Sequence, residues 1–378
     1  MNSDRLQAAQ RVDRLRDRIR EKLSFREAWT PQTVEGLHFR LLTSDVLQSQ
    51  ILFNDRQAAR ASEIAAEVIR SVGALSSARS AENGSDWQTL EMEALHSYAV
   101  ALALGGEIEP AIKASEQAVA IARKLVTPLS LDVLSTHANI LLARELEAPE
   151  TILRECLVRA SSQTTSRETR DAIVINLSMT LILEAHRSKT SNASEAQLKL
   201  DEASTLLKPI FSNSFRVGRY PDAGAASLLL GIISALRNEA DEVSWFAQAV
   251  TASARGGQME TLWRSHIDLA TALHRRNHRA SESVRDHARA ALQILEETLA
   301  PYPRPERSPR FDLVRIPLAQ AVRFLIQFGD EAGLTTLERY PSLRSCFQDP
   351  EHGILRHDRG GYRSHEWVSV AEWDYVIY

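Results

Sequence analysis

The chain has 378 residues, enough for two ordinary domains or one elongated array of repeats. Hydrophobic residues make up 44% and charged residues 25% of it, a composition that excludes wholesale disorder. The formal net charge is −4, from 45 basic and 49 acidic residues, so no global field favours general binding to nucleic acid. The first residues contain no apolar signal-peptide core, and eighteen apolar residues never run together, so we expect a cytoplasmic protein without a membrane span.

An amphipathic helix is expected at the start, over residues 1–24 of an N-terminal segment that we assign to 1–31. Its apolar side chains recur at the three-and-four spacing of one helical face: Ala8, Val12, Leu15, Ile19 and Leu23. The opposite face is rich in arginine and aspartate, and we expect it to be solvated.

The clearest helical hairpin is predicted in residues 94–124, ALHSYAVALALGGEIEPAIKASEQAVAIARK. Gly105 and Gly106 supply the positive φ that ends a first helix, and Pro110 stands near the start of a second, where its missing N–H costs little. Small side chains let the two helices approach closely: Ala111, Ser115 and Ala118.

The spacing of these small residues returns along the chain, later at intervals of about 40 to 47 residues. Residues 94–124 resemble a tetratricopeptide repeat: Tyr98 and Ala99 stand where that family has Leu-Gly, and Gly106 stands at the turn. Leu230-Gly231 opens the second-best match. The resemblance is to divergent long-helix variants found in bacterial regulators and multi-protein assemblies. It implies an all-α fold, an α-solenoid of six or seven antiparallel hairpins.

Polar stretches are expected to connect the hairpins, namely 74–86, 161–169, 187–195 and 212–224. The repeat array is assigned to 32–300, and a Pro/Arg-rich extended connector follows at 301–311. A terminal hairpin is predicted at 312–346, turning at Gly329-Asp330, and a C-terminal loop and aromatic tail at 347–378.

The tail ends in EWVSVAEWDYVIY, residues 366–378, whose side chains alternate with the period of a strand. Its large aromatic residues are candidates for partner binding: Trp367, Trp373, Tyr375 and Tyr378. Several destinations stay open. The tail could cap the last hairpin, pair with a strand of a partner, occupy the concave groove of the array, or be a disordered end.

Two basic segments are further candidates for partner binding. Residues 274–289 contain Arg275, Arg276 and Arg279, and the stretch 212–224 contains Arg216, Arg219 and Tyr220. Arginine forks suit phosphates and carboxylates. No aromatic residues interleave with the first segment, which disfavours single-strand nucleic acid, and nucleic acid is considered only for 274–315. A solvated helix face and a long turn are the structural alternatives.

A loop near the end gathers imidazole and carboxylate groups: His352, His357, Asp358 and His365. They could hold a metal or form an acid/base pair, although their spacing does not justify a particular ligand pattern, and a solvated surface loop is the alternative. Phosphate loops, zinc-protease helices, nucleophile elbows and kinase signatures are not found with the flanking structure that each requires.

We therefore expect a non-catalytic scaffold or adaptor with no cofactor, which binds a protein or peptide as a subunit of a bacterial multi-protein assembly. The alternatives are a peptide- or ligand-responsive regulator and a metal-dependent or acid/base enzyme that uses the C-terminal His/Asp loop. The sequence does not indicate an oligomeric state.

Overall fold

The computed structural model describes residues 3–25, 29–54, 57–75, 84–125, 128–143, 149–162, 165–189, 191–276, 281–300, 304–307 and 309–347. These residues form fifteen α-helices, two 3-10 helices and no strand. The predicted all-α class is thereby confirmed for the described residues, whereas the tail that the sequence predicts to be strand-like lies outside them.

In the first part of the chain the helices are α1 (Ser3–Ser24), α2 (Pro31–Asn54), α3 (Ala58–Leu75), α4 (Gly84–Leu104), α5 (Ile108–Ala122), α6 (Pro128–Ala143) and α7 (Pro149–Ser162). In the second part they are α8 (Arg167–Ser188), α9 (Ala193–Arg216), α10 (Tyr220–Leu236), α11 (Glu242–Gly256), α12 (Met259–Arg276), α13 (Ser281–Leu299), η4 (Pro305–Arg307), α14 (Pro309–Gln327), α15 (Glu331–Arg339) and η5 (Pro341–Phe347). None of the described helices is long and apolar enough to cross a membrane.

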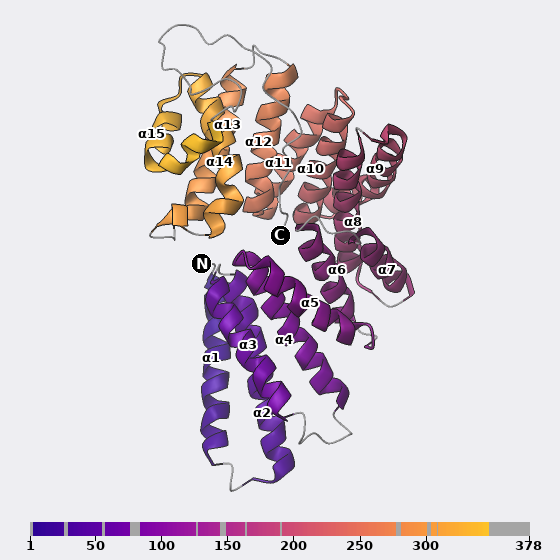
Figure 1. Ribbon diagram of the computed structural model, residues 1–378, viewed down its shortest axis with the longest axis vertical. Coiled ribbons are helices and arrows are strands. Elements are labelled where there is room, and N and C mark those ends of the chain that lie inside the picture. The colour runs from indigo at the N-terminus through magenta and orange to yellow at the C-terminus, as the bar shows by residue number, and fades with distance from the viewer. Residues whose placement is uncertain are drawn as a thin grey trace. The chain divides into compact units, whose positions relative to one another are not determined.

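The chain divides into two compact units, one reaching to Thr169 and the other starting at Arg170. From α1 to α7 and from α9 to α15, each helix packs on the next one along the chain, and Figure 1 shows these neighbours side by side. This is the predicted order of an antiparallel α-solenoid.

Even-numbered helices also contact the next even-numbered helix: α2 with α4, α4 with α6, α10 with α12, and α12 with α14. No contact of similar extent joins two odd-numbered helices among the described elements. The even-numbered helices are therefore the inner layer of each unit. We call the side of this layer that faces away from the odd-numbered helices the inner face.

Two predicted turns are confirmed. Gly106 follows α4 with φ 84°, a conformation that glycine adopts without a steric penalty. Gly329 follows α14 with φ 71°, and the Asp330 carboxylate accepts a hydrogen bond from the Ala332 N–H at 3.0 Å, which caps α15. The small residues of the predicted hairpin, Ala111 and Ala118, are fully buried.

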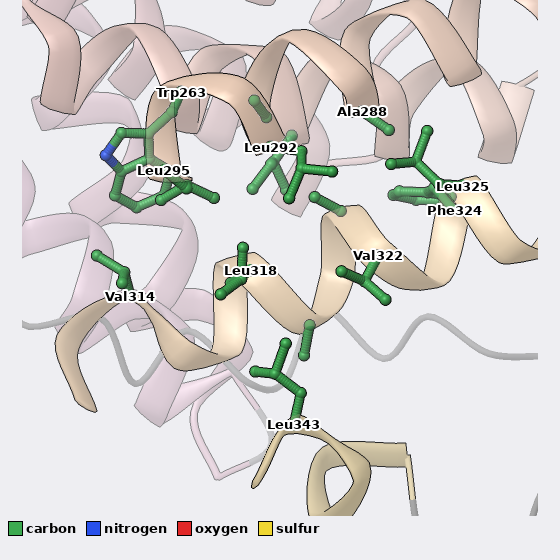
Figure 2. Packing of buried hydrophobic residues seen from close by; sticks show 14 of the residues in the cluster. Trp263, Ala288, Leu292, Leu295, Val314, Leu318, Val322, Phe324, Leu325 and Leu343 are labelled. Carbon is green, nitrogen blue, oxygen red and sulfur yellow. The ribbon is translucent and has the colours of Figure 1, made fainter. Parts of the chain in front are cut away.

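One hydrophobic core of the second unit joins α12, α13 and α14. Figure 2 shows Trp263, Leu292 and Leu295 on one side of α14 and Leu343, from η5, on the other. Because α14 is covered on both sides, η5 closes the end of this core.

The prediction of a loop at 212–224 is wrong. Helix α9 continues through Pro209 to Arg216, and α10 begins at Tyr220. Aromatic packing explains the difference: the Phe211 ring meets the Trp245 ring edge to face at 5.3 Å, and Phe215 meets Tyr220 at 5.8 Å. Tertiary contacts thus hold helical turns that the local sequence disfavours.

The predicted faces of the first helix also need correction. Ile19 is buried as expected, but Leu15 is 49% exposed. Arg16, from the face expected to be solvated, forms an ion pair with Asp45 of α2, and both side chains are only 13% exposed. Near the other end of the chain, η4 occupies part of the predicted extended connector, and α14 begins inside it.

Candidate interaction surface

A hydrogen bond aligns two inner helices of the second unit. Gln320 of α14 donates from its side-chain nitrogen to the Thr271 hydroxyl of α12 at 3.1 Å. Thr271 shares one helical face with Arg264, Asp268 and Arg275, because these positions are separated by three or four residues. This polar stripe therefore lies where α12 meets α14.

The carboxyl group of Asp268 has an unusual environment. Burial raises its pKa from 3.8 to about 7, and the neighbouring Arg264 and Arg275 offset only part of this effect. The Arg264 guanidinium in turn lies over the Trp263 ring, 5.1 Å from its centroid. The stripe thus consists of two arginines on either side of a carboxyl group that titrates near neutral pH.

Two arginines that the sequence suggested for partner binding hold the second unit together. The side chain of Glu242, the first residue of α11, has no exposed surface and pairs with both Arg275 and Arg276 of α12. Arg276 donates from Nε to this carboxylate at 2.7 Å, and its Nη2 donates to the Glu239 carbonyl at 2.6 Å. Both arginine side chains remain partly exposed, Arg275 at 26% and Arg276 at 32%. Arg279 lies outside the described residues.

The mid-chain candidates lie around the start of α10. Arg219 pairs with Asp171 of α8 and with Asp222, the latter at 3.1 Å, and is 18% exposed. Arg216 is exposed and donates to the Asn213 side chain at 3.3 Å. The Tyr220 ring lies 5.5 Å from the Arg255 guanidinium. Arg219 also donates to the Ser214 hydroxyl of α9 at 3.1 Å and therefore joins three helices, whereas Arg216 remains on the surface.

The first unit has a corresponding bridge with different chemistry. His96 of α4 and Thr136 of α6 are linked through Nε2 and Oγ1 at 3.0 Å. Glu93 and Asp132 precede them by one helical turn, and burial raises the pKa of both carboxyl groups. Burial also lowers the pKa of His96 to about 4, so this imidazole is neutral at pH 7. The stripe on this inner face is therefore acidic.

The remaining candidates cannot be placed. Trp367, Trp373, Tyr375 and Tyr378 lie outside the described residues, and so does the His352, His357, Asp358 and His365 loop. Within the described part of the chain no three His, Cys, Asp or Glu side chains come together as metal ligands.

Sequence reasoning missed the inner stripes. Arg264, Asp268 and Thr271 do recur at helical spacing, but most surface helices carry such a polar face. Only the packing of even-numbered helices on one another distinguishes these polar faces from those of the outer helices.

No protein-family model matches the sequence, and no curated protein matches it significantly. Among solved structures, the chain is similar to kinesin light chain-like TPR repeats from Podosopora anserina, with 18% identity over 57% of this chain and 97% of that one and a TM-score of 0.41. A single-substitution variant of those repeats matches with 17% identity over 68% of this chain and 95% of that one, at a TM-score of 0.33.

A circular tandem repeat protein is similar over 88% of both chains, with 16% identity and a TM-score of 0.27. At these levels the likenesses carry no information about a partner. By the order in which its own helices pack, the chain is an all-α helical-repeat protein that resembles the tetratricopeptide-repeat class.

Proposed function

We propose that this chain is a non-catalytic scaffold whose inner face binds a protein or peptide partner. The observation that supports this most directly is the inner layer, in which two pairs of neighbouring helices, α4 with α6 and α12 with α14, present polar side chains in register. Repeat arrays use such extended surfaces for binding. The proposal includes a role as a cytoplasmic subunit of a bacterial multi-protein assembly, as the long-repeat resemblance implies.

One pair of residues could suggest catalysis instead. The Ser115 hydroxyl and His137 Nδ1 are 2.8 Å apart, the distance of a nucleophile and its base. Both residues are buried between α5 and α6, at 3% and 6% exposure, and the Ser115 hydroxyl also contacts the Ile112 carbonyl at 2.8 Å. A substrate could not reach this hydroxyl without opening the helix pair, so we assign the contact a structural role.

The test compares full-length variants that differ only on the inner or the outer layer. Arg323→Glu changes an exposed residue of inner helix α14, and Arg255→Glu changes an exposed residue of outer helix α11. After affinity purification from the native host, we expect a stoichiometric partner with the wild type and Arg255→Glu, and its loss with Arg323→Glu. Cross-links should map to α12 and α14. If both variants retain the partner equally, or if the protein turns over substrates in hydrolase or nucleotide screens, the proposal is wrong.

A further inference from the structure

The inner face of the second unit has a basic patch formed by two parallel helices. The Thr271 to Gln320 hydrogen bond sets α12 and α14 in register. Arg275 follows Thr271 by one turn, and Arg323 follows Gln320 by one turn. The two arginines therefore lie at the same height along neighbouring helices. Arg264 extends the patch along α12. We call Arg264, Arg275 and Arg323 the arginine patch.

The next inner helix is apolar. Helix α10 packs against α12 and contains a single charged residue, Asp222. All residues from Ala226 to Leu236 are buried. From Ala226 to Leu236, α10 therefore offers no exposed apolar surface. The exposed charge of the inner layer lies on α12 and α14, where guanidinium groups suit a segment with acidic side chains.

The chain itself contains such a segment. Residues 366–378 carry three carboxylates, on Glu366, Glu372 and Asp374, and no lysine, arginine or histidine. The same thirteen positions contain Trp367 and Trp373. The charge of this segment is therefore complementary to that of the arginine patch.

The connection is also long enough. Eighteen residues lie between Phe347, the end of η5, and Glu366, and an extended chain of that length spans up to about 60 Å. Helix α14 has 19 residues, which corresponds to a length of about 28 Å. The segment can thus reach any point of the arginine patch without strain in the linker.

We propose that residues 366–378 dock on the arginine patch of the same chain. Their carboxylates would lie on the exposed Arg323 and on the exposed parts of Arg264 and Arg275, of which Arg275 also pairs with Glu242. This inference rests on the proposed function, because the tail covers the surface that a partner would use and must be displaced by it. A tethered segment acts at an effective concentration on the order of millimolar, so even a weak contact keeps the site covered. A partner with a similar acidic and aromatic segment competes directly with the tail.

The experiment uses full-length protein with the site opened. In the triple variant Glu366→Lys, Glu372→Lys and Asp374→Lys the tail carries the charge of the patch and is repelled from it. A fluorescent peptide with the native sequence of residues 366–378, capped at both ends, is titrated into this open variant and into the wild type, and its anisotropy is recorded. We expect at least tenfold tighter binding to the open variant, because the wild-type tail already occupies the site.

Two comparisons locate the site. Adding Arg323→Glu to the open variant should weaken peptide binding at least tenfold, whereas adding Arg255→Glu should leave it unchanged. A scrambled peptide of the same composition should bind at least tenfold more weakly than the native one. Circular dichroism and thermal unfolding confirm that each variant folds, which is expected because both arginines are exposed.

The proposal is overturned if the peptide binds the wild type as tightly as the open variant, if Arg323→Glu leaves its affinity unchanged, or if the scrambled peptide binds equally well. It is also overturned if the wild type excludes the peptide only as a dimer, since the tail would then dock on a second copy. These outcomes are separate from the partner test above: a partner could still depend on Arg323 when the tail peptide does not bind.

Discussion

The inner faces of the two units share an architecture and differ in charge. In the first unit, the His96 to Thr136 bridge lies one turn from two carboxyl groups, Glu93 and Asp132. In the second unit, the Thr271 to Gln320 bridge lies one turn from two arginines, Arg275 and Arg323. The order of helices sets which positions face inward, while the residues at those positions decide what the face can bind.

The two units also bury polar groups in different ways. The second unit encloses a charged carboxylate, Glu242, and compensates it with two guanidinium groups. The first unit encloses a neutral imidazole, His137, with a hydroxyl partner. Removing one partner of a buried ion pair costs far more free energy of unfolding than removing one partner of a neutral hydrogen bond. Substitutions at the buried polar groups should therefore destabilise the second unit more than the first.

The largest effect is expected for Glu242→Gln. The amide keeps the shape of the side chain but removes the counter-charge of Arg275 and Arg276, and we expect a loss of about 2–3 kcal/mol in the free energy of unfolding. Urea denaturation followed by circular dichroism measures it. The matched change in the first unit is Glu155→Gln, which removes the partially exposed pairs with Arg123 and Arg159 and should cost less than about 1 kcal/mol. Equal losses would contradict the difference between the units.

The next effect concerns the close packing of α10 on α11. A Cβ atom at Gly231 would lie 2.6 Å from two ring atoms of Phe246, which is itself buried. Gly231→Ala should therefore destabilise by about 1–3 kcal/mol, although alanine favours the helix.

Gly36→Ala in α2 is the control in the first unit, because nothing lies within 4 Å of its added Cβ. This change should stabilise by about 0.5–1 kcal/mol. If both alanine variants gain stability, the contact between α10 and α11 is looser than the structure shows.

A smaller, pH-dependent effect is expected at Asp268. Its pKa is about 7 in the folded chain and near 3.8 without burial, so its protonation stabilises the fold. That contribution is complete below about pH 4 and is lost as the pH rises through about 7. Asp268→Asn keeps the side chain neutral at every pH. As the pH rises from 5 to 8, the free energy of unfolding of this variant should therefore increase by about 1–2 kcal/mol relative to that of the wild type.

For His137 of the first unit, the free energy of unfolding should depend on pH in the opposite direction. Burial, with a smaller contribution from Arg123, lowers its pKa from 6.5 to about 4. Its contribution is therefore present above about pH 6.5 and lost as the pH falls through about 4, and the stability advantage of the wild type over His137→Asn should shrink on acidification. Denaturation curves at pH 5, 6.5 and 8 test both signs, and parallel behaviour of the two variants would refute the assignment.

The smallest effects distinguish the two faces of α1. Leu15→Gln should change the free energy of unfolding by less than about 0.5 kcal/mol, because the side chain is 49% exposed. Arg16→Gln should cost about 1 kcal/mol, since it leaves Asp45 without its partner. Hydrogen exchange of the α1 and α2 amides reports both changes locally. A larger loss for Leu15→Gln would favour the face expected from the sequence.

Several features follow from local sequence alone. The turn at Gly105 and Gly106 and the cap at Asp330 depend on backbone conformations and side-chain contacts within a few residues. The all-α class follows from apolar spacing in most segments. The loop expected at 212–224 is wrong because it is predicted from local preferences alone. The packing of Phe211 on Trp245 involves another helix and outweighs those preferences.

For the site, the sequence supplied the residue types but not their roles. It suggested Arg275 and Arg276 as partner contacts, and only the tertiary structure shows that a buried Glu242 engages both. Likewise, nothing in the local pattern distinguishes Arg323 on an inner helix from Arg255 on an outer one. The sequence by itself determined that this chain forms helical hairpins, because turns and amphipathic faces are local properties. The inner face was decided by the tertiary structure, because it depends on contacts between helices about 50 residues apart, such as Thr271 with Gln320.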